Sequence, residues 1–250
     1  MDLLGIKLAL QGMFAELGKK TSNTTNGGVP LLNTQTGEPN GMIAMSDLAN
    51  VLEAQHSFTC GLTIASYDGD YLRFRRLDQA ASYKSTAVGI GIFEAGHLLI
   101  VAKDETQAKW SEERVSGGTA ACGREAALID THGREKTQTI VNTLGANAPA
   151  ASFCQNYCPS NVANDNAFVG KGRWWLPAAG ELWMMYARLY ELNRALIAID
   201  GTPLDINGAY WSSTESGATP AWTQTFTTGS FGGTTYKETV YRVRPVSAFY

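Results

Sequence analysis

The strongest constraint on the fold is an alternation of large and small side chains near the carboxyl end. From residue 222 to residue 227 the chain runs W-T-Q-T-F-T. Because successive side chains of a β-strand point to opposite faces, this segment is predicted to be a strand with Thr on a free face and Trp, Gln and Phe on a packed one. After Gly208, short Thr-rich and aromatic runs separated by glycines favour a meander of strands to the C-terminus.

Two further segments have clear periodicity. Pro177 stands before a run of apolar residues spaced by three and four positions, which predicts a helix from about Ala178 to Ile197. Ala87–Ala102 is densely apolar around a Glu94–Gly96 turn and predicts a buried hairpin. Between them lies a loop-rich middle with shorter helices expected around 140–144 and 150–157.

The amino-terminal part has a different composition. Apolar residues from Leu3 to Leu17 fall at helical spacing over two heptads, so residues 1–20 are expected to form either an oligomerisation helix or an ordinary amphipathic helix. Residues 21–41 are mostly Ser, Thr, Asn, Gly and Pro and are interpreted as a linker or extended arm. Met45–Glu53 is expected to be a short helix capped by Ser46. We therefore expect a polar arm and small region over 21–86, followed by one domain over 87–250.

Composition excludes several classes of protein. The 250 residues carry 20 basic and 23 acidic side chains, and a net charge of −3 offers no footprint for a nucleic-acid backbone. No apolar run approaches the roughly 18 residues that a membrane helix requires. Asp2 stands where a secretory signal would be basic, and Lys7 and Gln11 interrupt its apolar region, so no export signal is expected.

The residues that usually carry chemistry are scattered. Cys154 and Cys158 are four apart, but a zinc site needs two more ligands and none accompanies them at usable spacing. The three histidines are far apart in the sequence, and no phosphate-binding loop, dinucleotide fingerprint or nucleophile elbow is present. The sequence therefore predicts no catalytic residues, no metal site and no cofactor.

Three ordered motifs carry a resemblance to a known family. They are Gly172–Pro177 (GRWWLP) with Gly180–Leu182 (GEL), Tyr210–Glu215 (YWSSTE), and Val243–Val246 (VRPV). Together they resemble the variable proteins of diversity-generating retroelements, over about 87–250. The resemblance implies an α+β domain with the C-type lectin fold, in the form shared with formylglycine-generating enzymes, with short strands, one long helix and a C-terminal meander. The amino-terminal arm more loosely resembles leaders on phage tail or prophage proteins.

In that family an error-prone reverse transcriptase rewrites adenine-bearing codons, which implies a variable region of about 210–246 here. Of the 21 residues from Ser216 to Tyr236, all but Trp222 and Gln224 can arise from a randomised Asn codon, although a Thr- and Gly-rich surface hairpin would look the same. The expected ligand-binding positions are Ser216, Gly217, Thr219, Thr223, Thr225, Thr227, Thr228, Ser230, Phe231, Thr234, Thr235, Tyr236, Thr239 and Tyr241.

A fixed scaffold is expected beneath those positions. Large aromatic side chains can each bury about 150–250 Å², enough to anchor strands whose other face changes. The expected scaffold residues are Trp175, Pro177, Glu181, Trp211, Trp222, Phe226 and Arg244. Phe231, Tyr236 and Tyr241 are the expected binding hot spots. Lys237, Arg244 and Glu215 are either solvated or paired within the fold, and Arg244 is expected to be structural.

The expected function is non-enzymatic recognition of a protein or glycan receptor on a bacterial cell surface, by a phage or prophage tail subunit. A homo-oligomer such as a trimer is expected, because several copies on one particle multiply avidity. Two alternatives stay open: a host surface adhesin for glycan or matrix without variation, and a formylglycine-generating oxidoreductase. The oxidoreductase would need a pair of thiols near the carboxyl end, whereas the last cysteine is Cys158. The location expected is a virion tail or a cell surface.

Overall fold

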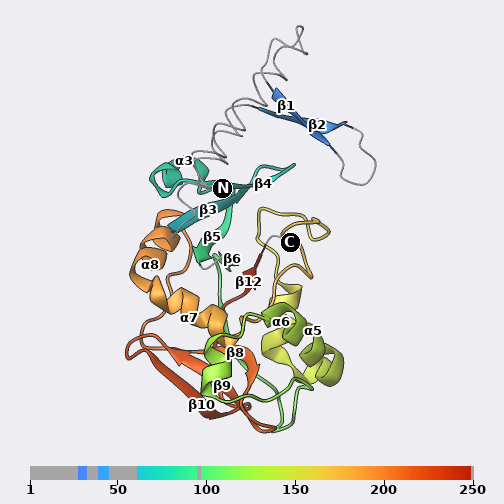
Figure 1. Ribbon diagram of the computed structural model, residues 1–250, viewed down its shortest axis with the longest axis vertical. Coiled ribbons are helices and arrows are strands. Elements are labelled where there is room, and N and C mark those ends of the chain that lie inside the picture. The colour runs from blue at the N-terminus through green and yellow to red at the C-terminus, as the bar shows by residue number, and fades with distance from the viewer. Residues whose placement is uncertain (1–27, 33–38, 45–60, 95–96, 249–250) are drawn as a thin grey trace, which may run out of the picture. The chain divides into compact units, whose positions relative to one another are not determined.

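The structure, a computed structural model, describes residues 28–32, 39–44, 61–94 and 97–248 (Figure 1). Contacts divide the chain into two units, Met1–Glu53 and Ala54–Tyr250. The helices expected over residues 1–20 and Met45–Glu53 lie outside the described residues.

The described part of the first unit is a two-stranded antiparallel sheet. β1 (Gly28–Leu32) pairs with β2 (Pro39–Ala44), with Gly28 opposite Ala44. Both strands begin within residues 21–41, the segment that the sequence predicts to be a linker or extended arm. Their sequences, GVPLL and PNGMIA, contain short apolar runs, which the surrounding Ser, Thr and Asn residues hide when composition is averaged over the whole arm.

The second unit is an α+β domain that contains two five-stranded sheets. The sheet named here the first sheet has the order β12-β6-β5-β3-β4, and all its neighbouring strands are antiparallel. Its strands are β3 (Gly61–Tyr67), β4 (Leu72–Arg75), β5 (Ala87–Glu94), β6 (His97–Ala102) and β12 (Val246–Ser247).

The second of the two, named here the C-terminal sheet, has the order β10-β9-β8-β11-β7. Its strands are antiparallel except for the parallel pair β8 and β11. They are β7 (Thr106–Lys109), β8 (Ala209–Glu215), β9 (Pro220–Thr225), β10 (Ser230–Tyr236) and β11 (Val240–Val243). The strand-rich carboxyl end is therefore as the sequence predicts.

The helices pack around both sheets. In Figure 1, α7 and α8 lie on one side of the view and α5 and α6 on the other. The bounds are η1 (Leu77–Gln79), α3 (Ala80–Tyr83), α4 (Arg124–Leu128), α5 (Gly133–Leu144), η2 (Gly145–Asn147), α6 (Pro149–Asn156), α7 (Ala179–Ala187) and α8 (Leu189–Ala198). Among the described residues, no helix has the length and apolar character needed to cross a membrane.

The central part of the first sheet is buried on both faces. Ile64, Ile90 and Ile92 pack with the apolar sides of α7 and α8 in one core cluster. Ile100 lies in a second cluster with Trp174. Burial from both sides explains why β5 is a nearly continuous apolar run rather than an alternating one, since neither face meets water.

The predicted hairpin over Ala87–Ala102 is confirmed, because β5 and β6 pair antiparallel with Glu94 opposite His97. The domain boundary is different from the one expected. Strands β3 and β4 belong to the same sheet as β5, and the unit begins at Ala54 rather than at residue 87. Beginning at 87 would remove two of the five strands of the first sheet.

The single helix expected over 178–197 is two helices. α7 ends at Ala187, Arg188 has φ −114° and ψ 16°, and α8 begins at Leu189. Both helices bury their apolar sides in the same core, with Leu182 and Met185 from α7 and Leu196 from α8. The three-and-four spacing therefore continues across the break, and neither Gly nor Pro marks it in the sequence.

Candidate ligand-binding surface on the C-terminal sheet

The three sequence motifs meet in the structure. Trp175 and Val246 exchange two backbone hydrogen bonds, with N···O distances of 2.8 and 3.0 Å. The Ser213 N–H donates to the Pro177 carbonyl at 2.8 Å, and the Ala179 N–H donates to the Thr214 hydroxyl oxygen at 3.0 Å. The start of α7, strand β8 and the last strand therefore hold one another in place.

Glu181 fixes the start of α7 from inside the protein. Its carboxyl group accepts the Ala178 N–H at 2.6 Å and the Trp175 indole N–H at 3.1 Å. Gly133 lies so close that an added Cβ would sit 2.2 Å from a carboxylate oxygen, so only glycine fits there. Burial raises the pKa of Glu181 to about 8. These contacts support the predicted scaffold roles of Trp175, Pro177 and Glu181.

Arg244 is fully buried and has the structural position that the sequence suggests. Its guanidinium donates to the carbonyls of Ala102 and Thr202 at 3.0 and 2.9 Å and to the Glu105 carboxylate at 2.6 Å. Glu105 also accepts the Tyr210 hydroxyl at 2.8 Å. This network ties the ends of β6, β7 and β8 to β11.

Glu215 and Lys237 form a buried ion pair, although the two side chains are 22 residues apart in the sequence. The Lys237 ammonium, which has no exposed side-chain surface, also donates to the Val115 and Ala218 carbonyls at 2.9 and 2.8 Å. Burial alone would raise the pKa of Glu215, but hydrogen bonds from Lys237, from Thr119 and from a backbone N–H outweigh it and lower the pKa. The pair binds the loop before α4 to the C-terminal sheet.

Trp222 and Phe231 stack face to face under α4 and α7. Their ring centroids are 4.7 Å apart and the planes differ by 6°. The Trp222 indole N–H donates to the Cys122 carbonyl at 3.1 Å. Trp222 is a scaffold residue, as predicted, but the prediction for Phe231 is wrong: it is 4 % exposed and cannot be a contact hot spot. Phe231 is opposite Gln224 in the β9–β10 register, which places its ring on the same buried face as Trp222.

The two-faced character of β9 is only partly as predicted. Trp222, Gln224 and Phe226 are buried, whereas Thr225 is half-buried and Thr227 is exposed. Thr223 contradicts the prediction of a free Thr face, because it is 5 % exposed. It lies between Trp211 on β8 and Gly232 on β10, and its hydroxyl is 3.3 Å from the Gly232 carbonyl, so neighbouring strands cover this small side chain.

The remaining scaffold aromatics lie on opposite sides of the C-terminal sheet. Trp211 packs in the cluster with Ile140 and Val243, and its ring is 5.2 Å from that of Tyr241. Phe226 packs in the cluster of the first sheet, with its ring 4.9 Å from that of Tyr210. Each face of the sheet therefore has its own aromatic anchor.

Five expected ligand-binding residues are exposed, around the β9–β10 turn and along β10. We name Thr227, Thr228, Ser230, Thr234 and Tyr236 the display surface. Tyr236, with 49 % of its surface exposed, is its one aromatic residue. The other expected positions are half-buried or, for Thr223 and Phe231, buried; the half-buried ones are Ser216, Gly217, Thr219, Thr225, Thr235, Thr239 and Tyr241.

Gly229 lets the turn inside the display surface form. It has φ +62°, a conformation that favours glycine, and an added Cβ would sit 2.5 Å from the Tyr186 hydroxyl. Arg114 was not singled out by the sequence. Its guanidinium lies 4.1 Å from the centre of the Tyr236 ring and pairs with Glu238. Only the tertiary fold brings residue 114 to this edge.

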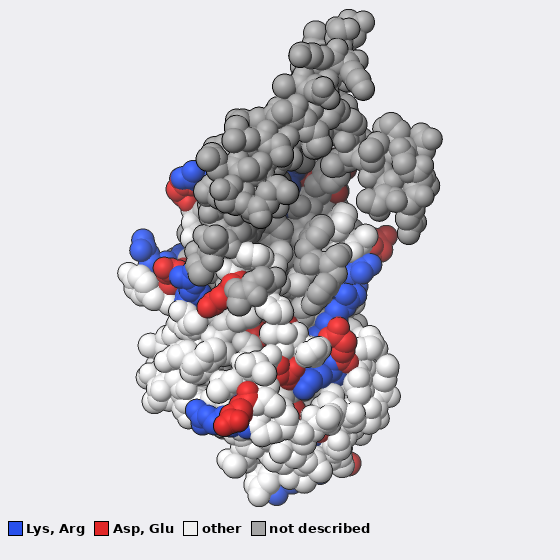
Figure 2. Space-filling view, viewed as in Figure 1, with Lys and Arg blue, Asp and Glu red and all other residues white. Residues whose placement is uncertain are grey.

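Charge is sparse on the display surface. Its five side chains contribute hydroxyl groups and one phenol ring but no ionisable carboxylate or ammonium group. Figure 2 shows that the part of the molecule formed by the C-terminal strands carries few charged side chains on the face in view. This surface suits hydrogen bonding and aromatic contact more than attraction of a highly charged partner.

The three cysteines that the structure describes, Cys122, Cys154 and Cys158, are free thiols. Cys154 is buried in a core cluster, and burial raises the pKa values of Cys122, Cys154 and Cys158. Within 61–94 and 97–248, no group of three or more His, Cys, Asp or Glu side chains could hold a metal ion.

Comparisons with known proteins give a fold and no family. No protein-family model matches the chain, and no curated protein matches it. A solved structure of a fimbrial protein from Bacteroides ovatus is similar, with a TM-score of 0.59 and 18 % sequence identity over 75 % of this chain. The match covers 48 % of the fimbrial protein, so this chain spans about half its length. At that identity the likeness supports the α+β fold alone.

Proposed function

We propose that this protein is a non-enzymatic ligand-binding protein with a C-type lectin-like domain, and that the display surface contacts the ligand. One observation carries the proposal: hydroxyl and phenol side chains are exposed on strands whose opposite sides are anchored by buried aromatic and ionic contacts. Such strands keep their shape when exposed side chains are replaced, because the replaced groups contribute little to folding.

The composition of the display surface supports recognition. Thr and Ser supply adaptable hydrogen-bonding groups, and Tyr supplies a rigid contact area at low entropic cost, as in antibody paratopes. Tyr236 is the one predicted hot spot that is exposed on this surface, and the Arg114 guanidinium against its ring restricts its motion.

The cysteines argue against an oxidoreductase. A thiol nucleophile or copper ligand reacts as the thiolate, and burial disfavours the thiolate of Cys154 most of all. The half-buried Cys122 and Cys158 also have raised pKa values. The remaining cysteine, Cys60, lies outside the described residues.

We also propose that the display surface is diversified by a retroelement, as the three motifs suggest. Burial limits the positions at which diversification is compatible with folding. The five display residues are exposed and can be replaced, whereas Phe231 and Thr223 are packed and cannot. The flanking DNA tests it. We expect a near-copy of the 210–246 coding region beside a reverse transcriptase gene, with adenine-confined differences at display codons. Absence of such a copy would remove the diversification claim while leaving ligand binding intact.

For the location we propose an exposed surface, either of a cell or of a phage tail. The likeness to a fimbrial protein favours the cell surface, and with it the second candidate function, an invariant adhesin for glycan or matrix. Mass spectrometry of purified virions and of cell-envelope fractions separates the two.

Several copies on one particle would raise avidity about 10²–10⁴-fold, so we propose a homo-oligomer such as a trimer, which sedimentation velocity tests.

Binding itself is tested by replacing the display surface. The five residues are changed together to Ala, and adhesion of the labelled full chain to a panel of bacterial cells is compared with that of the unchanged protein. We expect adhesion to be lost with no change in folding. The matched control changes five exposed residues elsewhere: Lys171, Arg173, Tyr190, Glu191 and Ile197. Equal adhesion by the display variant and the unchanged chain would contradict the proposal.

A further inference from the structure

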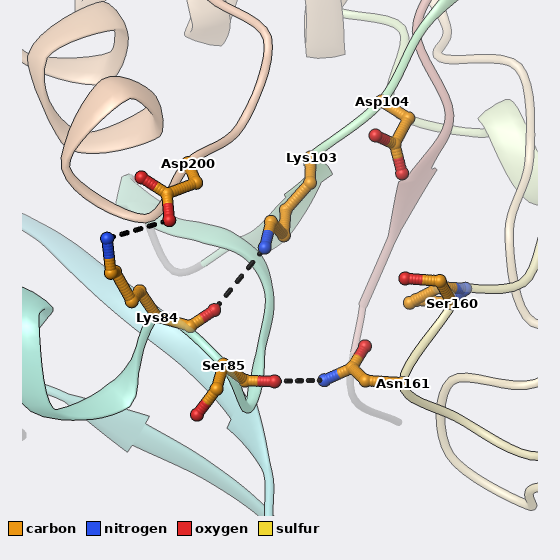
Figure 3. Close-up of a pocket in the computed structure, with 8 residues that line it drawn as sticks. Lys84, Ser85, Lys103, Asp104, Ser160, Asn161 and Asp200 are labelled. Atoms are coloured by element: carbon orange, nitrogen blue, oxygen red, sulfur yellow. Dashed lines mark hydrogen bonds and ion pairs between the residues drawn. The ribbon is translucent and has the colours of Figure 1, made fainter.

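A polar pocket lies away from the display surface, where four segments of the second unit converge (Figure 3). Its volume is about 380 Å³. The walls come from Lys84 and Ser85 after α3, Lys103 and Asp104 after β6, the 159–161 loop, and Asp200 after α8. None of these residues belongs to the ligand-binding positions derived from the sequence.

Hydrogen bonds between the segments hold the walls together. The Asn161 amide donates to the Ser85 carbonyl at 3.2 Å, and the Lys84 ammonium pairs with Asp200 at 2.8 Å. The Lys103 carbonyl accepts the Thr202 N–H at 2.8 Å. The buried Arg244 guanidinium donates to the same carbonyl at 3.1 Å. The pocket is therefore formed before any ligand arrives.

The pocket offers one cation and one anion that no ion pair neutralises within the described residues. The Lys103 ammonium makes a long hydrogen bond of 3.4 Å to the Lys84 carbonyl. One oxygen of Asp104 accepts the Tyr157 hydroxyl at 2.8 Å. In Figure 3 the Asp104 carboxylate points toward Ser160, and the Lys103 side chain descends into the space between them and Lys84.

We infer that this pocket binds one uncharged sugar unit. A sugar hydroxyl both donates and accepts hydrogen bonds, so neighbouring hydroxyls can accept from Lys103 and donate to Asp104 at once. Pockets of roughly 300–1,000 Å³ hold small organic ligands, and this one is at the small end of that range. The charges of the two Lys and two Asp side chains cancel, which disfavours a phosphate or a polyamine as the ligand. No aromatic side chain lines the walls, so binding would depend on hydrogen bonds.

Asp200 has a left-handed backbone conformation directly after the C-cap residue of α8, Ile199. Its φ of +55° is the left-handed region, and it is the single non-glycine residue with positive φ in the described part of the chain. Replacing Asp200 by Gly relieves the backbone and removes the carboxylate that positions Lys84. A variant that binds sugar less well while unfolding at an equal or higher temperature therefore indicates that the side chain serves the pocket and not the fold.

The test uses the full chain and saturation-transfer NMR with methyl glycosides of glucose, galactose, mannose and N-acetylglucosamine. We expect at least one glycoside to bind with Kd of about 1–10 mM. Lys103→Met and Asp104→Asn should each weaken that binding at least about tenfold, which is about 1.4 kcal/mol. Ser160→Trp should abolish binding, because Ser160 is exposed and a large side chain there fills the hollow without entering the core.

Two controls separate this inference from the proposed function. Lys109→Met removes a Lys charge on the C-terminal sheet and should leave glycoside binding unchanged. The five-residue display variant should also leave it unchanged, whereas the pocket variants should not affect cell adhesion through the display surface. Absence of binding by every glycoside, binding that all three pocket variants retain, or competition by inorganic phosphate with K103M-sensitive binding would overturn the inference.

Discussion

The two sheets of the second unit are stabilised by different interactions. The first sheet is covered by apolar side chains on both faces of its central strand β5, which has six consecutive buried residues. The C-terminal sheet depends on a buried ion pair, on the Arg244 and Glu105 network and on stacked aromatic rings. A sheet of the first kind has no surface to vary. The second kind concentrates much of its stabilisation in a few buried side chains and leaves others exposed.

The largest expected effect is at Lys237. Lys237→Met leaves Glu215 charged and buried without its partner, so we expect the free energy of unfolding to fall by about 3–5 kcal/mol. Urea denaturation measures it. The double variant Glu215→Leu with Lys237→Met removes both charges and should recover a large part of that loss. If the free energy of unfolding of K237M equalled that of the unchanged protein, the ion pair would not stabilise the C-terminal sheet.

In the first sheet the corresponding test is a cavity. Ile90 is fully buried, and Ile90→Ala should cost about 2–5 kcal/mol in the free energy of unfolding through lost apolar contact and the space left behind. Unlike Lys237, this residue has no charged partner, so no second substitution should restore stability. Recovery of the stability of Ile90→Ala by a nearby polar substitution would contradict the conclusion that the first sheet is stabilised by apolar packing.

The pH dependence of the free energy of unfolding distinguishes two buried carboxyl groups, those of Glu181 and Glu215. The pKa of Glu181 is raised from an ordinary 4.5 to about 8 in the folded protein, so between these values the unfolded chain has lost a proton that the folded protein keeps. The stability contributed by this group is therefore complete below about pH 4.5 and is lost as the pH rises through about 8, by about 1.4 kcal/mol per pH unit.

The non-titrating variant Glu181→Gln isolates that dependence. The free energy of unfolding of the unchanged protein minus that of E181Q should decrease from pH 5 to pH 8 and then level off, as measured by urea denaturation across the range. For Glu215, whose pKa is lowered, the sign is opposite: its stabilisation is present above the unfolded pKa and is lost on acidification. A difference that rises with pH for Glu181 would show that the carboxyl group is ionised in the fold.

The smallest expected effect is on the display surface. Single Ala substitutions at Thr227, Thr228 and Thr234 should change the free energy of unfolding by less than about 0.5 kcal/mol, because the side chains are exposed. Thermal unfolding monitored by circular dichroism is sufficient to detect a larger change. Phe231→Ala is the matched buried change on the same strand, and only this one should lower the unfolding temperature clearly.

The sequence predicts features that repeat along the chain better than those that depend on contacts between distant segments. The β5–β6 hairpin was visible because dense apolar residues surround a turn. The period-two alternation correctly placed Trp222 and Phe226 inside, but it says which face a residue is on and not how deeply neighbours cover it, so Thr223 was misplaced. The break at Arg188 was invisible because both helices bury the same side.

The site was harder to predict than the fold. Nothing local indicates that Glu215 and Lys237 would pair, or that Arg114 would reach Tyr236, since loops of unknown path join them. The polar pocket takes Lys84, Asp104 and Asp200 from separate segments, and in the sequence each of these residues looks like an ordinary solvated charge. Glu181 was recognisable only because it lies in a motif.

The proposed recognition role requires the C-terminal sheet to keep its structure when its exposed residues change. Native-state hydrogen exchange of the β8, β9 and β10 amides measures this directly in the unchanged protein and in a variant with all five display residues replaced by Ala. Equal protection of these amides in the two proteins is the predicted result. Loss of protection along β9 and β10 in the variant would mean that the exchanged side chains are part of the scaffold, which would contradict the account.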